Sequence, residues 1–475
     1  MTSPAFLRLQ GLSDVEDARR QRLVSVLHRA RRANLRQEAY YEGARAVRDL
    51  GIAIPPHLRD VEAVAAWPEI VVDVIDERME WRGWHTPDVD LGLKSVYEDN
   101  HGAVEVGQAT LDSLIFGLSY LTVGTGGDDE PEVLFKAESP NRMTATWDPR
   151  RRRTTEGLVE LFDDRGQLSG WKLYVPGETV TVERQGGRLV VTDRDPHGRP
   201  RVPISVLLNR PRASRVSGRS EITRAVRSLT DSGMRTLLGM EVSREFYGAP
   251  QRYAMGADEE MFVDDKGERV SQWAAMIGRM LMLPRDEDGE VPTVGQFTAT
   301  SPQPFTELLK TYSQMVSAAS GVPATHLGFA TDNPASAEAI QRADMRLDKR
   351  AIRRQGQYDL GLVDLGDLCV LWRDGELPPP GSVKSRWLPV TMVAPGAAAD
   401  RATKMIAAGV LDPTWDFTLE QFGLSDDEIQ RVRQESLRSN GRSAIATLRD
   451  AAAAARADQE VAELSATTRG ATTTV

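Results

Sequence analysis

The sequence predicts an α+β protein with a mostly helical body and a β-rich part built from antiparallel strands. Apolar residues recur at three- and four-residue steps over the first 120 residues and again after residue 217, which is the period of amphipathic helices. Between these regions, short β-rich runs alternate with turn formers. No helical pattern separates the runs, so we do not expect a parallel βαβ array.

The N-terminal region reads as helical. Residues 15–48 are rich in Arg, Leu, Ala and Glu, and a Pro-containing loop follows at 52–56. The next helix has Pro68 at a favoured first-turn position and one stripe formed by Trp67, Val71, Val74 and Arg78. A further helix is expected over 99–116, ending near Gly117.

The β-rich region begins at residue 116. Turn formers such as Gly124-Thr-Gly-Gly127 and Pro176-Gly177 separate its runs. The predicted strands are 118–123, 132–137, 142–147, 157–162, 170–175, 178–183, 188–192 and 202–208.

Helix returns after Ser217. A helix is predicted over 218–247, and a small mixed module rich in Gly and acids follows over 248–300. The clearest periodicity comes next and ends at Gly321 and Pro323. Its apolar stripe is formed by Phe305, Leu308, Leu309, Tyr312, Met315, Val316 and Ala319.

A loop over 321–333 precedes a long helix that starts at Asn333-Pro334, with Asn as the N-cap. If unbroken over some 38 residues, it would reach about 57 Å. Gly356, Gly361 and Gly366 would allow a kink. Its apolar stripe comprises Ile340, Leu347, Ala351, Tyr358, Leu362, Leu365, Cys369 and Trp372. A short strand over 385–393 and an Ala-rich helical C-terminus follow, where Ser425-Asp-Asp-Glu428 has the pattern of a capping box.

Composition excludes several classes. The chain has 475 residues and a formal net charge of −10, which argues against a protein that coats DNA through its net charge but not against one past which DNA slides. No run approaches the roughly 20 apolar residues that span a bilayer. The N-terminal segment runs directly into Asp14, Glu16 and Asp17, so it lacks the apolar core of a signal peptide. The only cysteine, Cys369, permits no internal disulfide and no Cys-based zinc site.

Catalytic signatures are absent from the sequence. It has no phosphate-binding P-loop, no His-Glu-x-x-His and no Gly-x-Ser-x-Gly, and its six histidines are scattered singly. The acidic pairs at 163–164, 264–265 and 426–427 could bind Mg²⁺, but turn and cap roles suit them better. We therefore predict no catalytic residue, no metal site and no cofactor.

Two basic segments remain. Arg150–Arg153 is a dense run that suits a solvated hairpin better than a DNA contact. The first half of the long helix is heavily charged, and Arg346 and Arg350 would repel each other there unless Asp344 and Asp348 offset them. This helix is either an exposed charged face or the lining of a polar channel, and residue patterns alone favour the exposed face.

The order of segments resembles the portal proteins of tailed bacteriophages, in the branch common among phages of actinobacteria (the SPP1-like portal family). No single motif is diagnostic, and the resemblance extends to about residue 395. The segments that carry it are Gly321-Val-Pro-Ala-Thr-His-Leu-Gly328, Asn333-Pro-Ala-Ser-Ala-Glu-Ala-Ile340, Tyr40-Tyr-Glu-Gly43, Gly51-Ile-Ala-Ile-Pro-Pro56, the helix from Trp67 to Arg78, and Asn141-Arg-Met-Thr-Ala-Thr-Trp-Asp148.

The resemblance implies a ring, usually a dodecamer, at one capsid vertex, through which double-stranded DNA is packaged and ejected. It implies a portal fold with a β-rich wing, long stem and wing helices and a helical crown. The implied parts are a wing (1–216), a stem helix (217–247), a clip (248–300), a second stem helix (301–323), a tunnel loop (324–333), a long helix with a returning wing strand (334–394), and a crown with the C-terminal tail (395–475).

The implied functional residues form three sets. The tunnel loop would contain Thr325, His326, Leu327, Gly328, Phe329, Ala330, Thr331, Asp332 and Asn333. Contacts to DNA or between subunits would come from Arg342, Arg346, Lys349 and Arg353, and the sequence leaves both roles open. Docking at the clip would involve Asp286, Glu287 and Asp288.

The implied partners are further copies of the chain, the terminase large subunit, the head–tail connector or adaptor, the major capsid protein and a scaffolding protein, with no membrane. The expected location is the portal vertex of the virion, and the host cytoplasm during assembly. Two alternatives stay open, namely another capsid-assembly or minor head protein and a metal-dependent nuclease that uses the acidic pairs. A minor head protein would lack the order of stem, clip and stem.

Overall fold

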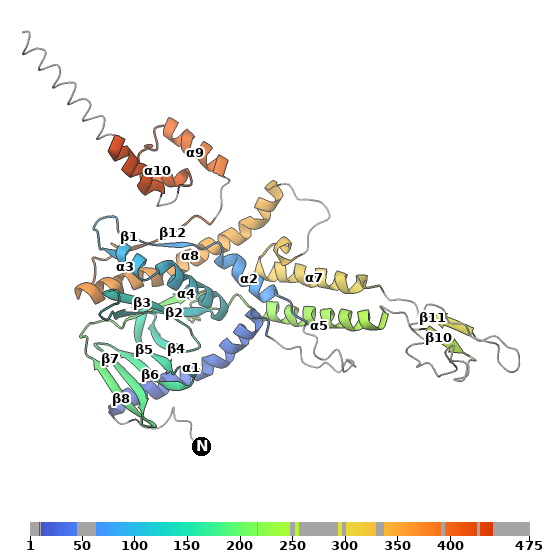
Figure 1. Ribbon diagram of the computed structural model, residues 1–475, viewed down its shortest axis with the longest axis horizontal. Coiled ribbons are helices and arrows are strands. Elements are labelled where there is room, and N and C mark those ends of the chain that lie inside the picture. The colour runs from blue at the N-terminus through green and yellow to red at the C-terminus, as the bar shows by residue number, and fades with distance from the viewer. Residues whose placement is uncertain are drawn as a thin grey trace, which may run out of the picture. The chain divides into compact units, whose positions relative to one another are not determined.

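The chain divides into two compact units, Met1–Val390 and Thr391–Val475, in the computed structural model shown in Figure 1. No helix among the described residues is long and apolar enough to cross a membrane. The residues that the structure describes are 9, 11–44, 63–215, 217–247, 252–255, 293–296, 301–328, 337–390, 395–424 and 428–439.

All eight predicted strands of the β-rich region are present, and the α+β class is confirmed. They form two antiparallel sheets, a division that the sequence did not predict. The three-stranded sheet has the order β3-β2-β9, with β2 (Leu118–Thr125), β3 (Val133–Glu138) and β9 (Ile204–Leu208). The five-stranded sheet is a meander of β4 (Met143–Asp148), β5 (Arg153–Phe162), β6 (Leu168–Val175), β7 (Glu178–Gln185) and β8 (Arg188–Asp195).

Helix α1 (Asp14–Tyr41) packs on the five-stranded sheet through both apolar and charged contacts (Figure 1). Leu23, Val24 and Leu27 share a buried core with strands β5, β6 and β7. The Arg20 guanidinium lies 5.0 Å from the ring centroid of the fully buried Trp171. The helix begins with a Ser13 capping box and ends at Tyr41, earlier than predicted, because Gly43 takes a left-handed conformation.

The helices that follow α1 correct the prediction in two places. Helix α2 (Trp67–Asp76) buries the predicted stripe but ends before Arg78. The helix predicted over 99–116 is α4 (Gly102–Phe116), and a separate α3 (Leu93–Asp99) precedes it. The break occurs because the buried Asn100 amide turns toward β3, where it donates to the Val133 carbonyl and accepts from the Phe135 N–H.

Strand β1 (Trp81–His85), which the sequence did not predict, pairs antiparallel with β12 (Lys384–Trp387). The strand expected over 385–393 is therefore present but ends at Trp387, and residues 391–393 of that expectation lie outside the described residues. Trp81 and Trp84 of β1 pack edge to face with ring centroids 4.9 Å apart, and the Trp84 indole N–H donates to the Leu362 carbonyl of α8 at 2.7 Å.

The long helix α8 (Ala337–Asp374) is one continuous helix. Every residue of its predicted stripe from Leu347 to Trp372 is buried. The glycines at 361 and 366 mark close packing of the helix against its neighbours. A Cβ at Gly361 would lie 2.4 Å from the Val206 carbonyl oxygen of β9, and one at Gly366 would lie 2.8 Å from the Trp84 side chain.

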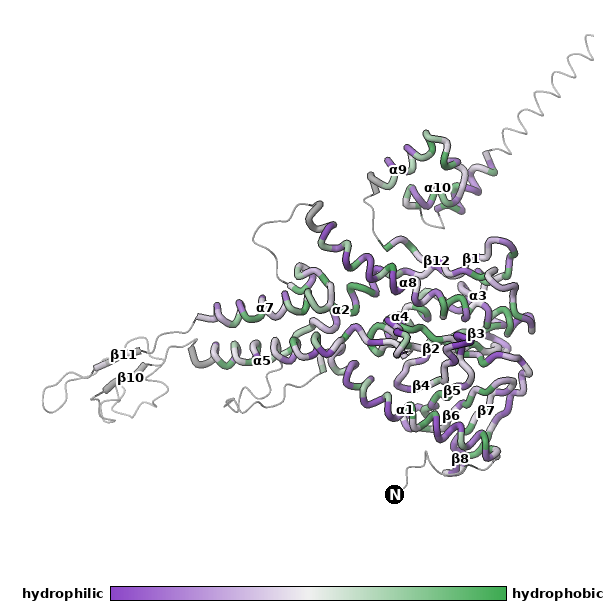
Figure 2. The backbone as a smooth tube through the Cα atoms, turned by 180° about the vertical axis from the view of Figure 1, so that it is seen from behind, coloured by the Kyte–Doolittle hydropathy of each residue, from purple (hydrophilic) through white to green (hydrophobic). Residues whose placement is uncertain are grey.

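Helices α5 (Arg224–Tyr247) and α7 (Gln303–Ser320) lie side by side, as Figures 1 and 2 show from opposite sides. Beyond them, β10 (Arg252–Met255) pairs antiparallel with β11 (Thr293–Gln296). Helix α5 begins six residues later than predicted, because residues 218–223 form the packed turn described below. Leu309 and Val316 of the predicted α7 stripe are buried, but Leu308 and Met315 are exposed, so the stripe is not wholly core.

The second unit contains α9 (Pro395–Ala407), α10 (Asp416–Gln421) and a helix over 428–439, in agreement with the helical C-terminus predicted from its composition. Arg433 of the last helix pairs with Asp416 of α10 at 2.7 Å. The expected capping residues 425–427 lie outside the described residues.

The α8 glycines provide a matched test of the packing. Gly361→Ala should lower the free energy of unfolding by about 1–3 kcal/mol, since its Cβ would overlap the β9 backbone. Gly356→Ala should instead raise it by about 0.5–1 kcal/mol, because Gly356 is exposed on the same helix and a Cβ there meets nothing within 4 Å. Urea denaturation followed by circular dichroism measures both, and equal effects would contradict the close-packing role.

Candidate functional site

The start of α5 is packed tightly against the end of α4. After β9 the chain returns past Gly218, where a Cβ would lie 2.0 Å from the Gly117 carbonyl oxygen. The Asn209 N–H donates to that same oxygen at 3.0 Å, and the Glu221 N–H donates to the Leu114 carbonyl at 2.9 Å. These contacts fix Glu221 three residues before α5 begins.

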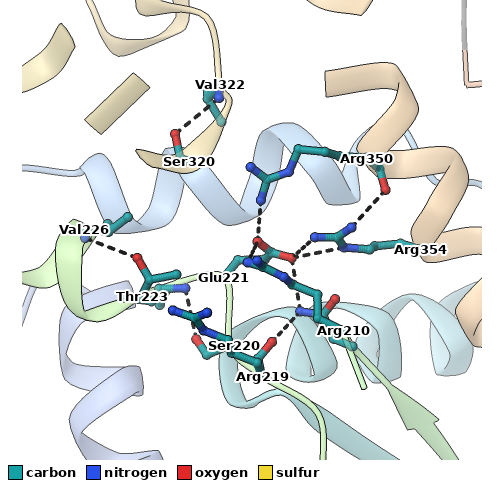
Figure 3. Close-up of polar contacts among 12 residues, drawn as sticks. Arg210, Arg219, Ser220, Glu221, Thr223, Val226, Ser320, Val322, Arg350 and Arg354 are labelled. Carbon is teal, nitrogen blue, oxygen red and sulfur yellow. Dashed lines mark hydrogen bonds and ion pairs between the residues drawn. The ribbon is translucent and has the colours of Figure 1, made fainter. Parts of the chain in front are cut away.

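The Glu221 carboxylate is fully buried and is held by three arginines, as Figure 3 shows. Arg354 of α8 donates to Oε1 from Nε at 3.0 Å and from Nη2 at 2.5 Å. Arg350, one turn earlier on α8, donates to Oε2 at 2.6 Å. Arg210 donates to Oε2 at 3.2 Å, and the Asn209 amide donates to Oε1 at 3.2 Å. We call Glu221, Arg210, Arg350 and Arg354 the junction cluster.

The electrostatics of the junction cluster follow from its burial. Burial opposes the charged form of Glu221, but Coulombic attraction to Arg354, Arg350 and Arg210 outweighs it, and the pKa of Glu221 lies below its usual range. Burial lowers the pKa of Arg350, and the neighbouring Arg354 and Arg210 act in the same direction against the attraction of Glu221. The single carboxylate therefore holds together cations that would otherwise repel one another.

A second polar contact joins the beginning of the expected tunnel loop to α8. Residues Ala324–Leu327 form a 3₁₀ helix (η4) rather than an irregular loop. The His326 Nε2 lies 3.4 Å from Asp344 Oδ1 of α8. Arg78, which follows α2, contacts Asp344 at 3.6 Å and Asp348 at 3.2 Å. Asp344 thus pairs with Arg78 and His326, and Asp348 pairs with Arg78. The sequence had not indicated either partner.

The expected loop residues are only partly described. Thr325, His326 and Gly328 are exposed, and Leu327 is buried. The remaining loop residues, Phe329 to Asn333, lie outside the described residues. So do the three clip acids, Asp286, Glu287 and Asp288.

The basic row of α8 is exposed as a set. Arg342, Arg346, Lys349 and Arg353 all face solvent, and none of them forms an ion pair with another described residue. Sequence reasoning missed the two arginines that turn inward, Arg350 and Arg354, together with their partner Glu221. The only available signal was the i,i+4 spacing of the two arginines, which does not identify a partner 129 or 133 residues away.

The acidic pairs do not assemble a metal site in the part of the chain that the structure describes, where no three His, Cys, Asp or Glu side chains gather. The Asp163 carboxylate instead accepts from the Arg165 and Gln167 N–H groups, as the turn interpretation predicted. The pairs at 264–265 and 426–427 lie outside the described residues. Arg150, Arg151 and Arg152 lie in the turn between β4 and β5, where Asp148 accepts from the Arg150 N–H, and Arg153 begins β5.

Residues 28–440 match the family described as "Phage portal protein, SPP1 Gp6-like". The chain belongs to this phage portal protein family. It is 31% identical over 424 residues to the portal protein of Mycobacterium phage D29, covering 86% of each chain. It is 29% identical over 423 residues to that of Mycobacterium phage L5, covering 86% of this chain and 85% of the relative.

Two solved structures are more distant. A chain in the "Neck of empty GTA particle computed with C6 symmetry" is 17% identical with a TM-score of 0.43, and the match covers 76% of this chain and 90% of that one. A chain in the "Neck of native GTA particle computed with C12 symmetry" is 16% identical with a TM-score of 0.42 and the same coverage. The family resemblance inferred from the order of segments is thus confirmed by the family match and the two mycobacteriophage relatives.

The junction cluster should contribute to the stability of the fold. Glu221→Gln should lower the free energy of unfolding by about 3–5 kcal/mol, because three buried or half-buried guanidinium groups lose their counter-charge. Urea denaturation at pH 7 measures the loss. As a control, Glu376→Gln at an exposed site should change it by less than about 0.5 kcal/mol.

The pH dependence of the stability lost in Glu221→Gln tests whether Glu221 is ionised in the folded protein. Because the folded-state pKa of Glu221 is lowered, its stabilisation is present above the unfolded glutamate pKa of about 4.3 and is lost as the pH falls through the folded-state pKa. The difference between wild type and Glu221→Gln should therefore shrink at acid pH. A difference that does not depend on pH would contradict an ionised Glu221.

Proposed function

We propose that this portal-family chain assembles into a ring at one capsid vertex, through which double-stranded DNA is packaged and ejected. The observation that carries this proposal is the family match over residues 28–440, a range that includes α5, the β10–β11 pair, α7 and α8. The order of helix, small β module and antiparallel helix is the order expected for a stem, a clip and a second stem helix. It favours a portal over a minor head protein.

The proposed parts of the protomer follow this order. The first unit up to residue 216 serves as the wing, and α5 and α7 serve as the stem helices. The segment 248–300, which contains β10 and β11, serves as the clip and docks the terminase and later the head–tail connector. The second unit serves as the crown. The protein then belongs to the virion and needs no catalytic residue of its own.

Net charge supports a conduit over a DNA-gripping protein. A ring of twelve copies, each carrying −10, would total roughly −120. Such a field repels phosphates over most of the surface, so DNA contacts would be confined to local basic side chains. No described acidic cluster favours the nuclease alternative.

Assembly tests the proposal directly. The chain has a mass of 52.4 kDa, so a ring of twelve would be about 630 kDa by light scattering. Electron cryomicroscopy of the particle should show a closed ring with a central hole at least ~20 Å wide, the diameter of duplex DNA. A particle whose vertex holds this chain in any arrangement other than a closed ring would contradict the proposal.

The tunnel-loop assignment has its own test. The buried Leu327 restricts the change to later residues, so 329–333 would be replaced by a Gly/Ser segment of equal length. Ring assembly should be unchanged while packaging or DNA retention falls, measured as nuclease-protected DNA per particle. The matched control is the same replacement of the exposed residues 128–130, which should leave protected DNA unchanged. Normal packaging in the loop variant would show that the loop is misplaced.

A further inference from the structure

Helix α7 presents an apolar face that nothing in the described part of the chain covers. Leu308 and Met315 lie seven residues apart and are 45% and 51% exposed. Leu309 and Val316, about 100° round the helix from them, are buried. Pro304, Thr311, Ala318 and Ala319 complete this face without a charge, and the exposed Glu307 lies at its edge.

Helix α8 presents a second stripe with the same spacing. Met345 and Ile352 also lie seven residues apart and are 52% and 54% exposed. Leu347 and Ala351, on other sides of the same turns, are buried. The basic row Arg342, Arg346, Lys349 and Arg353 flanks this stripe.

The two stripes match each other in repeat and in charge. Seven residues of helix span about 10.5 Å, so apolar side chains on both helices recur at the same interval. The α7 face carries no cation that would repel the basic row. The exposed Glu307 at its edge offers that row a carboxylate to pair with. Methionine on both sides can adapt its shape to the contact.

Closure of a ring requires such a pair of unlike surfaces. In a cyclic assembly each subunit contacts the next through two different patches, and a self-complementary patch would close only dimers. We propose that α7 of one subunit packs against the N-terminal half of α8 of the next, with Leu308, Met315, Met345 and Ile352 at the centre. This inference rests on the proposed ring and assigns its subunit contact.

This assignment also decides between the two roles left open for the basic row. Phosphate contacts use cationic and hydrogen-bonding groups. A DNA-facing α8 would place Met345 and Ile352 among those groups, where they recognise nothing and stay in water. Against a neighbouring subunit the same two side chains leave water, and the flanking arginines bond to its carboxylate and amide groups. The basic row thus borders a contact between protein subunits.

Cysteine cross-linking tests the contact in the full-length chain. The native Cys369 is 1% exposed, so it can stay in place. Met315→Cys combined with Met345→Cys should give, under mild oxidation, a ladder of disulfide-linked multimers on non-reducing gels. Each single variant should give no ladder, because the contact joins unlike surfaces. The control pair Val104→Cys with Met345→Cys, both at exposed sites, should also give none.

The possible results distinguish the α7–α8 contact, the pairing of unlike surfaces and the proposed ring itself. A ring of normal mass without a ladder would overturn the α7–α8 contact and leave the proposed function standing. Dimers from either single variant would overturn the unlike pairing. A chain that forms no ring in the particle would overturn the proposed function itself.

A second variant removes the dependence on disulfide geometry. Met345→Asp lies at an exposed site, so the melting temperature of the unassembled chain should stay within a few degrees of wild type. The fraction of chain in the ring should fall at least tenfold, measured by light scattering. Val104→Asp should lower neither value, and full assembly of Met345→Asp would contradict the proposal.

Discussion

The first unit depends on one constraint, the burial of the Glu221 carboxylate. A charge removed from water must be paired, and here the pairing comes from three directions at once. Arg210 follows β9, Glu221 leads into α5, and Arg350 and Arg354 project from α8. The direction in which α5 leaves the unit is therefore set by charge and hydrogen-bond geometry at its base as well as by apolar packing.

Helix α8 connects this base to the rest of the protein. Its C-terminal half has a buried apolar face and two closely packed glycines, and it contacts β9 and β1 at backbone distance. Its N-terminal half divides its charges by direction. Arg350 and Arg354 face Glu221, Asp344 and Asp348 face Arg78, and the basic row faces solvent. A rigid helix thus links the segment proposed as the tunnel loop, which contacts Asp344, to the base of the proposed stem, which contacts Arg350 and Arg354 about two and three turns further along α8.

The exposed stripes give the same helices a second role. A single chain exposes Met and Ile side chains to water on two long helices. Contiguous exposed apolar surface commonly marks an interface, and assembly would bury it. In a portal this arrangement separates two tasks. The junction cluster fixes the base of α5 within each protomer, while the α7 and α8 stripes are proposed to connect one protomer to the next.

The sequence by itself determined the elements whose signal is local. Alternating runs bounded by Gly and Pro located all eight strands of the β-rich region, and apolar periodicity located α2, α7 and the buried face of α8. The order of those elements also indicated the portal family. Only the tertiary structure decided which runs pair into which sheet, that β1 exists, and that Glu221 meets Arg350 and Arg354. It also decided that Leu308 and Met315 are surface, since an apolar period is the same whether the face meets its own core or another chain. Ion-pair partners more than a hundred residues apart produce no local sequence pattern, so only the folded structure reveals that they meet.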